Sequence, residues 1–329
     1  MQSLSPSSQS NPFRRIFGFS GIFLISLLSV LVPMLISSCG GESVPSCSGD
    51  TLSVSDSSRS GALTQSEIWS GTINVTGDIL LGENCILEIR PGTQVRFANN
   101  SDVTGHGFNT PITDSSFPND PAKKPSEMSG IELWGGPLNA EGSRRASITF
   151  TSDAGSPTAG DWHSIAFRQA GSKLILKNVV VEYGYYGIQI SAAAGSENVQ
   201  IQNNTIREAV GCGLCTGDAS ATYSVAFTIS GNTFEACGHE GVDTHSNATL
   251  TIDGNTFADN RGKFVGDPHE VGGNGVVVDR SPSIIRNNTF VRNNQGIACV
   301  TDGSNPTIES NTFGTAGDAN DENIQNCPR

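Results

Sequence analysis

Charged residues are scarce in this 329-residue chain, since Asp, Glu, Lys and Arg together make up 16% of it. Bases are scarcer than acids, at 19 against 32, so the formal net charge is −13. Such a charge repels a phosphate backbone, which excludes nucleic acid as an expected partner. The low charge content excludes an intrinsically disordered acidic chain, and the length excludes a short disulfide scaffold. Glycine, in contrast, is plentiful, with 38 residues.

Long apolar stretches are missing except for residues 17–36, which Arg14 and Arg15 precede. A basic segment followed by an apolar segment is the layout of a secretory signal. The stretch ends in small residues directly before Cys39. This ending resembles the lipobox of bacterial lipoproteins, which implies that residues 1–38 are a signal peptide and that Cys39 carries lipid.

That resemblance implies an exported protein whose partner is the membrane, reached through lipid on Cys39. Gly40 after the cysteine favours the outer membrane or cell surface of a bacterium, by analogy with enteric sorting. Two alternatives stay open: a plain membrane helix, because about 20 apolar residues span a bilayer, and ordinary cleavage with an unlipidated cysteine. Residues 39–61 are rich in Ser and Gly and predict a flexible tether.

A short phrase, Asn-Thr followed by Ile or Phe, recurs in the second half of the chain. Ile stands three residues before each repeated Asn, and an apolar residue stands two residues after it. Successive copies are separated by 26, 28, 23, 33 and 23 residues, so the unit is about 23 residues with insertions. The repeated residues, with a degenerate copy first, are Asn178, Asn204, Asn232, Asn255, Asn288 and Asn311.

Each unit also holds a Gly followed by an apolar residue, and three short runs of period two separated by turns. Such runs are too short for helices. One coil of three strands per unit, each strand paired in parallel with the next coil, explains the pattern. Asn suits the turn because it tolerates left-handed backbone, and stacked amides can bond the next coil. The alternative is glycosylation of the sequons at Asn203, Asn247 and Asn287.

This repeat resembles the right-handed parallel β-helix family of the pectate-lyase-like superfold, most clearly over residues 173–313. The resemblance implies an all-β fold, a right-handed parallel β-helix with three strands per coil and about ten coils. We expect it to occupy residues 62–329. Residues 62–72 and 314–329 should cover the two open ends, which would otherwise expose unpaired strand edges.

The residues around Gly241 are the predicted site. In the resembled superfold, ligands usually lie along the outer face of the strand that begins here with Gly-Ile or Gly-Val. Side chains alternate along a strand, so Asp243 and His245 should face outward, with Asp279 one coil further on. The largest insertion, residues 258–273, should hang over this patch. The other charged members of the patch are His239, Glu240, Asp267, His269 and Glu270.

Three chemistries fit this patch, and a merely solvated polar face is the alternative to all of them. Carboxylates beside histidine can act as acid and base on a glycosidic bond or a uronate. Oxygen ligands suit Ca²⁺, and histidines suit Zn²⁺, although no HExxH motif supports zinc. The predicted catalytic residues are Asp243, His245, Asp279 and Glu270. The possible calcium ligands are Asp243, Asp267, Glu270 and Asp279, and the possible zinc ligands are His239, His245 and His269.

Aromatic side chains on the same side could stack on sugar faces. Tyr185 and Tyr186 lie in a turn before the outward strand, and Trp134 should face out nearby. Packing of the tyrosines at a coil corner is the alternative. The predicted ligand-binding residues are His239, Glu240, Asp267, His269, Tyr185, Tyr186, Trp134 and Arg168.

Cysteine is limited to 8 residues, so lipidation of Cys39 would leave seven, an odd number that requires at least one unpaired thiol. An exported protein can oxidise the others. Cys212 and Cys215 have the spacing of a redox motif, but redox sites place that motif at a helix start beside a βαβ unit. The strand pattern here predicts a structural role.

These observations predict a membrane-anchored β-helix lipoprotein that binds glycan or a surface protein, or serves as a stalk or adhesin. The alternative is a polysaccharide lyase or glycoside hydrolase acting at the patch. The polygalacturonase-like set of paired Asp, Gly-His-Gly and Arg-Ile-Lys is missing, and few bases lie on the outward strand, which weighs against an enzyme.

Overall fold

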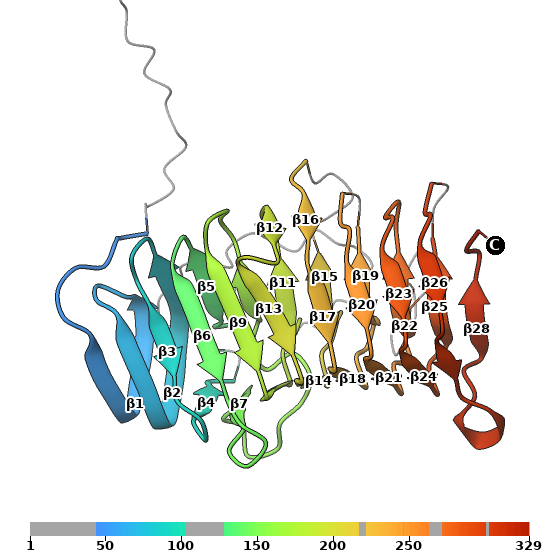
Figure 1. The fold of residues 1–329 in the computed structure, drawn as a ribbon. Helices are drawn as coiled ribbons and strands as arrows, with labels where there is room; N and C mark the ends of the chain where they lie inside the picture. Colours follow the sequence, from blue (N-terminus) through green and yellow to red (C-terminus); the bar gives the residue numbers. More distant parts are fainter. Residues whose placement is uncertain are drawn as a thin grey trace, which may run out of the picture. The chain divides into compact units, whose positions relative to one another are not determined.

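The chain winds into stacked β-coils. In a computed structural model, the described residues are 44–99, 101–102, 128–216, 222–245, 247–262, 272–300 and 303–328. Within them, 26 strands form one continuous sheet whose strands pair in parallel (Figure 1). A 3-10 turn, Ala316–Asp318, is the one helical element of these residues, and none of their helices is long and apolar enough to cross a membrane.

Each coil has three faces and contributes one strand to each. The first face holds β3 (Leu87–Ile89), β6 (Pro137–Glu141), β9 (Lys173–Lys177), β13 (Val199–Gln202), β17 (Thr228–Ser230), β20 (Thr251–Asp253), β23 (Ile284–Arg286) and β26 (Thr307–Glu309). The second face holds β4 (Gln94–Phe97), β7 (Ile148–Ser152), β10 (Val179–Glu182), β14 (Thr205–Arg207), β18 (Thr233–Glu235), β21 (Thr256–Ala258), β24 (Thr289–Val291) and β27 (Thr312–Phe313). The third face holds β5 (Ile131–Trp134), β8 (Ile165–Phe167), β11 (Ile188–Ile190), β15 (Leu214–Thr216), β19 (Glu240–Thr244), β22 (Asn274–Val278), β25 (Gln295–Cys299) and β28 (Glu322–Gln325).

Two longer strands precede these coils. β1 (Leu52–Ala62) pairs along its length with β2 (Glu67–Gly82), and β2 pairs in turn with β3, β4 and β5. β1 and β2 therefore run round one coil each, and the other 24 strands of the 26-stranded sheet, three to a coil, make eight more. The total of ten coils confirms the predicted number. Outside this sheet, β12 (Ala194–Gly195) pairs with β16 (Val225–Ala226).

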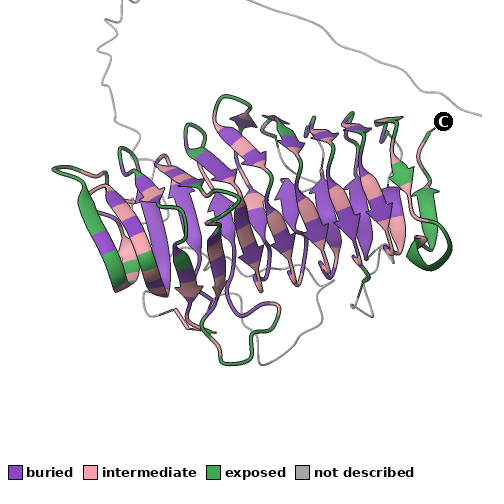
Figure 2. Ribbon diagram, turned by 60° about the horizontal axis from the view of Figure 1, so that its bottom comes forward, coloured by how far each residue is buried: buried purple, intermediate pink, exposed green. Residues whose placement is uncertain are grey.

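The core consists of side chains stacked in files along the coil axis. Buried residues recur on the strands of successive coils (Figure 2). On the first face, the isoleucines three residues before the repeated Asn lie in register from coil to coil, as predicted. On the second face, the phenylalanine rings stack, with centroids 5.2 Å apart for Phe234 and Phe257 and 4.9 Å for Phe257 and Phe290. The repeated Gly leaves room for these rings, because a Cβ on Gly241 would lie 2.6 Å from the Phe257 ring.

The degenerate copy of the repeat is offset by one residue from its predicted register. Leu176, not Ile175, pairs with Ile201, and Val179 takes the place of the repeated Asn, its backbone N–H donating to Asn204 Oδ1 at 3.0 Å. Ile175 therefore faces outward on β9. Asn178 has the residue type of the ladder position, but it is the left-handed turn residue that precedes that position, with φ of 50°.

The repeated Asn residues form a buried ladder. In one step, Asn232 Nδ2 donates to Asn255 Oδ1 at 3.0 Å and to the backbone oxygen of Ile201 at 3.0 Å, while its backbone N–H donates to the same Asn255 oxygen. The predicted amide ladder is thus present. The left-handed conformation, however, belongs to the residue before each ladder Asn, as at Gly231 and Gly254. The ladder residues are selected for hydrogen bonding rather than for backbone freedom.

A second ladder that the sequence analysis missed lies between the second and third faces. The Asn260 backbone and side-chain N–H groups donate to Asn293 Oδ1 at 3.1 and 2.9 Å, and Asn293 makes the same bonds to Asn320. Asn260 and Asn293 are fully buried. The turns at both ends of the second face are therefore held by amide stacks.

The folded region begins earlier than predicted, so the tether cannot extend to residue 61. β1 starts at Leu52, and Cys47 forms a disulfide with Cys85, 38 residues further along the chain. The Ser-rich composition was misleading because the first coil is covered on one side only. Val54 is the one fully buried side chain of β1, so polar residues suffice elsewhere in the strand.

The C-terminal segment continues the solenoid. β28, within the range expected to close the open end, pairs in parallel with β25 as the third strand of the last coil. A disulfide between Cys299 and Cys327 ties this coil to the one before it. A third disulfide joins Cys212 and Cys215, and Cys237 is the free, buried cysteine of the described residues.

Candidate functional site

The outer side of the third face carries the predicted file of outward residues. Asp243 of β19 lies in register with Cys215 of β15 on one side and Val277 of β22 on the other. The same file runs on to the neighbouring coils through Gln189 and Ala298. The regular repeat therefore placed these side chains correctly.

The buried Glu240 and the half-buried His239 form a pair at the corner where β19 begins. The Glu240 carboxylate is 1% exposed and contacts His239 Nδ1. Burial raises the pKa of Glu240 to about 7, and the neighbouring His239 opposes that rise. A carboxyl group in this setting can hold or release a proton near neutral pH.

His245 bridges two carboxylates from adjacent coils. Its Nε2 lies 2.8 Å from Asp243 Oδ2, and its Nδ1 lies 3.3 Å from Asp279 Oδ2. Asp243 is the main cause that raises the pKa of His245 to about 10, so the ring is charged at neutral pH. Arg280 also pairs with Asp279, at 3.0 Å. The structure thus brings together three of the four predicted catalytic residues.

The fourth predicted catalytic residue, Glu270, lies outside the described residues, as do Asp267, His269 and Cys39. The calcium set loses two of its four members in this way, and the zinc set loses one of three. Both metal sites therefore stay predictions.

One group of metal-type side chains does converge in the described residues. Cys212 Sγ and carboxylate oxygens of Glu240 and Asp243 all lie within 4.8 Å of one another. The sulfur is held in the disulfide with Cys215, and a metal requires a free thiolate. In its oxidised form, this group is therefore no metal centre, and the disulfide agrees with the structural role expected of these cysteines.

Trp134 and Arg168 both converge on Glu132, which is fully buried. Trp134 Nε1 donates to Glu132 Oε2 at 2.7 Å, and the Arg168 guanidinium donates to Glu132 Oε1 at 3.3 Å. The two predicted ligand-binding residues therefore lie on the expected side, but they share an internal carboxylate partner. The sequence analysis assigned no role to Glu132.

Tyr185 and Tyr186 are buried, so the expectation of exposed stacking rings is corrected. They are 7% and 8% exposed and meet edge to face at 5.0 Å. With Met128, Cys212 and Cys215 they form a small apolar cluster outside the main core. The tyrosines pack there because the disulfide offers an apolar surface beside their turn.

Residues 159–313 match the family model described as the right handed beta helix region. This part of the chain belongs to the right-handed β-helix family. No curated protein and no solved structure gives a match. The match, together with the ten parallel coils, shows the predicted fold class, a right-handed parallel β-helix.

The β-helix holds one candidate residue that the sequence analysis passed over. Asn274 lies in register with Glu240, one coil further on, and is fully buried. Both of its side-chain amide atoms lack a hydrogen-bond partner, as does Asp243 Oδ1. The residue directly before each repeated Gly could have revealed this position, because Glu240 and Asn274 both occupy it.

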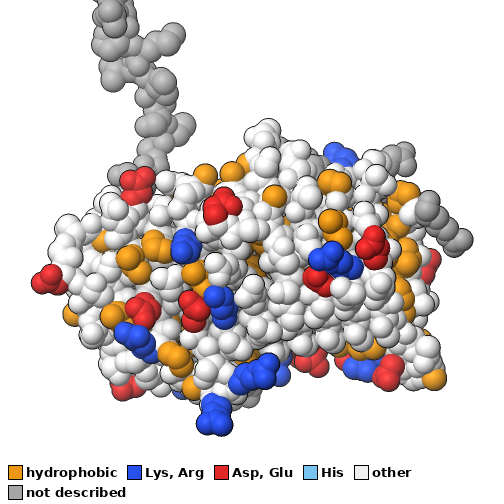
Figure 3. Space-filling view, viewed as in Figure 1, with side chains coloured by type: hydrophobic (Ala, Val, Ile, Leu, Met, Phe, Trp, Pro, Cys, Tyr) orange, Lys and Arg blue, Asp and Glu red, His pale blue; other side chains and the backbone are white. Residues whose placement is uncertain are grey.

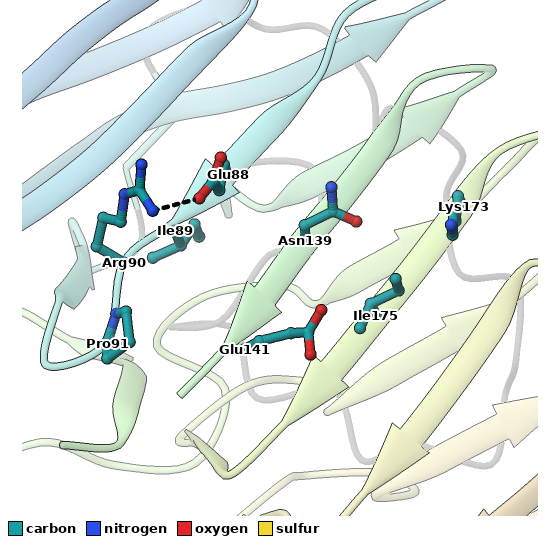
Figure 4. A pocket seen from close by; sticks show the side chains of 8 residues that line it. All are labelled: Glu88, Ile89, Arg90, Pro91, Asn139, Glu141, Lys173 and Ile175. Atoms are coloured by element: carbon teal, nitrogen blue, oxygen red, sulfur yellow. Dashed lines mark ion pairs between the residues drawn. The ribbon is translucent and has the colours of Figure 1, made fainter. Parts of the chain in front are cut away.

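A second surface feature of the β-helix lies on the first face and does not involve the predicted site. It is an open groove of about 490 Å³ lined by residues of β3, β6 and β9 (Figure 4). Its charged rim consists of Glu88, Arg90, Glu141 and Lys173. In Figure 3, seen from the side of Figure 1, acidic and basic side chains are interspersed. This groove offers mixed charge at its surface, whereas the third face buries the carboxylates of Glu132, Glu240 and Asp243.

Proposed function

We propose that this protein is an exported, lipid-anchored β-helix protein that binds a glycan along the outer third face. The observation that carries the proposal is the buried, paired polar network of that face. Glu132, Glu240 and Asp243 are at least nine-tenths buried, although all three lie outside the main core. Buried charges cost stability unless they are paired, so a face that only meets water has no need of them.

The charged residues of the first face are more exposed than the buried carboxylates of the third face. Its outward ion pair, Lys177 with Glu141, is 27% and 54% exposed at the side chains, as expected of a solvated sheet. The third-face network runs over successive coils about 4.8 Å apart. Such a row of donors and acceptors suits an extended, hydroxyl-rich chain such as a polysaccharide.

Glycan binding is tested with the purified full-length protein on a panel of neutral and uronic-acid polysaccharides, by calorimetry. Asp243→Asn removes a charge without changing the size of the side chain. We expect it to weaken binding at least tenfold, about 1.4 kcal/mol. The matched control, Lys177→Gln on the first face, should bind as the wild type does. The absence of measurable binding by the wild-type protein to any polysaccharide of the panel would refute glycan binding.

A hydrolase or lyase is the second candidate, favoured by the approach of the Glu240 and Asp243 oxygens to within 4.8 Å. In that reaction, Glu240, which is not among the predicted catalytic residues, is the acid that protonates the leaving oxygen, and its pKa of about 7 suits that role. The same panel is assayed for new reducing or unsaturated ends. Glu240→Gln should abolish their release and preserve binding, and release should decline above pH 7. Absence of product from the wild type would exclude this candidate.

Lipid anchoring is tested separately by substituting Cys39. Cys39→Ser removes the thiol that would carry the lipid. Labelled fatty acid should be incorporated into the wild-type protein and not into the variant, and the variant should leave the membrane fraction. Equal labelling of both proteins would contradict the anchor.

A further inference from the structure

Two side chains on the third face combine deep burial with unused hydrogen-bonding capacity. Asn274 is 0% exposed, and neither its Oδ1 nor its Nδ2 has a partner. Asp243 is 7% exposed, and its Oδ1 has no partner, although its Oδ2 contacts His245. Buried polar groups are nearly always hydrogen-bonded, so this combination requires an explanation.

The fold itself does not require the unpaired state. Buried asparagines at the neighbouring turns, such as Asn255 and Asn260, use both their oxygen and their nitrogen in ladder bonds. Asn274 lies on the same coil stack but makes no such bonds. An apolar residue at this position would cost less, as Val277 and Ala298 illustrate on the adjacent file. Asn274 therefore points to a bound molecule rather than to folding.

The unpaired atoms define what that molecule must offer. Asn274 Nδ2 needs an acceptor, whereas Asn274 Oδ1 and Asp243 Oδ1 need donors. A metal ion would leave Nδ2 unpaired, and a carboxylate has no donor for Asp243 and is repelled by it. A hydroxyl group both donates and accepts, and two hydroxyls on adjacent carbons would satisfy all three atoms.

We propose that Asp243 and Asn274 form a subsite for a neutral sugar residue that presents adjacent hydroxyls. This inference rests on the proposed glycan binding and narrows its ligand class, because it disfavours uronates. The carboxylate of Glu240, in register with Asn274, adds a further acceptor beside the subsite.

A small buried apolar cluster lies beside these polar atoms. On successive coils, the Gly187 N–H donates to the backbone oxygen of Cys212, and the Gly213 N–H donates to the backbone oxygen of Glu240. Tyr186, Cys212 and Glu240 each stand next to these bonds, so they follow one another along one corner of the coils. Tyr186 and Cys212 belong to the small apolar cluster. Because Tyr186 is buried, this cluster borders the subsite and supports its shape, and the polar atoms alone face the sugar hydroxyls.

The test is Asn274→Leu, which replaces the unpaired amide by an apolar group of similar size. We expect at least a tenfold loss of affinity for the neutral glycan that the wild type binds best. Without glycan, we expect a higher midpoint of thermal unfolding than in the wild type, because two unsatisfied buried atoms are removed. The matched control is Asn139→Leu, in the first-face groove of Figure 4, which should leave glycan affinity unchanged.

Three results would overturn the subsite while glycan binding by the wild type survives. The first is an unchanged glycan affinity in Asn274→Leu. The second is a lower unfolding midpoint of that variant, which would mean that buried water satisfies the amide in a structural role. The third is tighter binding of uronic-acid polymers than of neutral ones. A wild-type protein that binds no glycan at all would instead refute the proposed function, and the subsite with it.

Discussion

Replacing Asn255 by alanine should lower the free energy of unfolding by about 3–5 kcal/mol, because it breaks the ladder at its middle. Asn255 Oδ1 accepts from the backbone and side chain of Asn232 at 2.9 and 3.0 Å. Its Nδ2 donates at 3.1 Å to both Asn288 Oδ1 and the backbone oxygen of Ile229. Alanine would remove these four hydrogen bonds and leave the Asn232 backbone N–H and the Ile229 backbone oxygen without their ladder partner in the buried interior. The left-handed residue of this turn is Gly254, so alanine at 255 adds no backbone strain.

The measurement is urea unfolding followed by circular dichroism, with Asn311→Ala as the control. Asn311 ends the ladder and is half-buried, so its partners can turn to water. We expect a loss of about 1 kcal/mol there. Similar small losses in both variants would mean that stacked apolar files, rather than the ladder, hold the coils in register.

The coil architecture was predictable because one physical requirement repeats every coil. An inward Ile or Phe must meet its counterpart in the next coil, so the columns are visible in the sequence as fixed spacings. The same periodicity placed Asp243 on the outer file next to Cys215. The second ladder carried an equal signal, with spacings of 33 and 27 between Asn260, Asn293 and Asn320, and was overlooked because it lacks the following Thr.

The limits of prediction lay where the context departs from the repeat. The end coil has a neighbour on one side only, so β1 is a strand although its Ser-rich composition is typical of a tether. At Asn178, residue type and register disagree, and register is set by packing of Leu176 against Ile201. The sequence of a single coil shows neither how many neighbours that coil has nor which residue packs against the next coil.

Side-chain pairing in the site was also beyond the sequence. Spacing brought Asp243, His245 and Asp279 to one surface, but it did not indicate that His245 bonds both carboxylates. Nor did it show that Tyr186 would be buried against a disulfide. These outcomes depend on burial and on side-chain conformations, which differ from coil to coil although the backbone repeats.

Because His245 is charged at neutral pH, we expect His245→Gln to destabilise the protein by about 3 kcal/mol at pH 7. Glutamine can still donate a hydrogen bond, but it leaves Asp243 and Asp279 without the charge between them. Because Asp243 raises the pKa of His245 from 6.5 to about 10 on folding, the histidine's contribution is complete below pH 6.5 and disappears as the pH rises through 10. The difference between the two proteins should therefore shrink between pH 7 and pH 10.

Urea unfolding of both proteins at pH 6, 8 and 10 measures this difference, with Lys177→Gln as the matched control. Lys177 pairs at 3.2 Å with the exposed Glu141, and its loss should cost less than about 0.5 kcal/mol at pH 6 and pH 8. A His245→Gln penalty that stays constant from pH 6 to pH 10 would mean that the ring acts by packing and not by its charge. A penalty that falls with rising pH identifies the half-buried His245 as the ion that holds the two adjacent coils' carboxylates together.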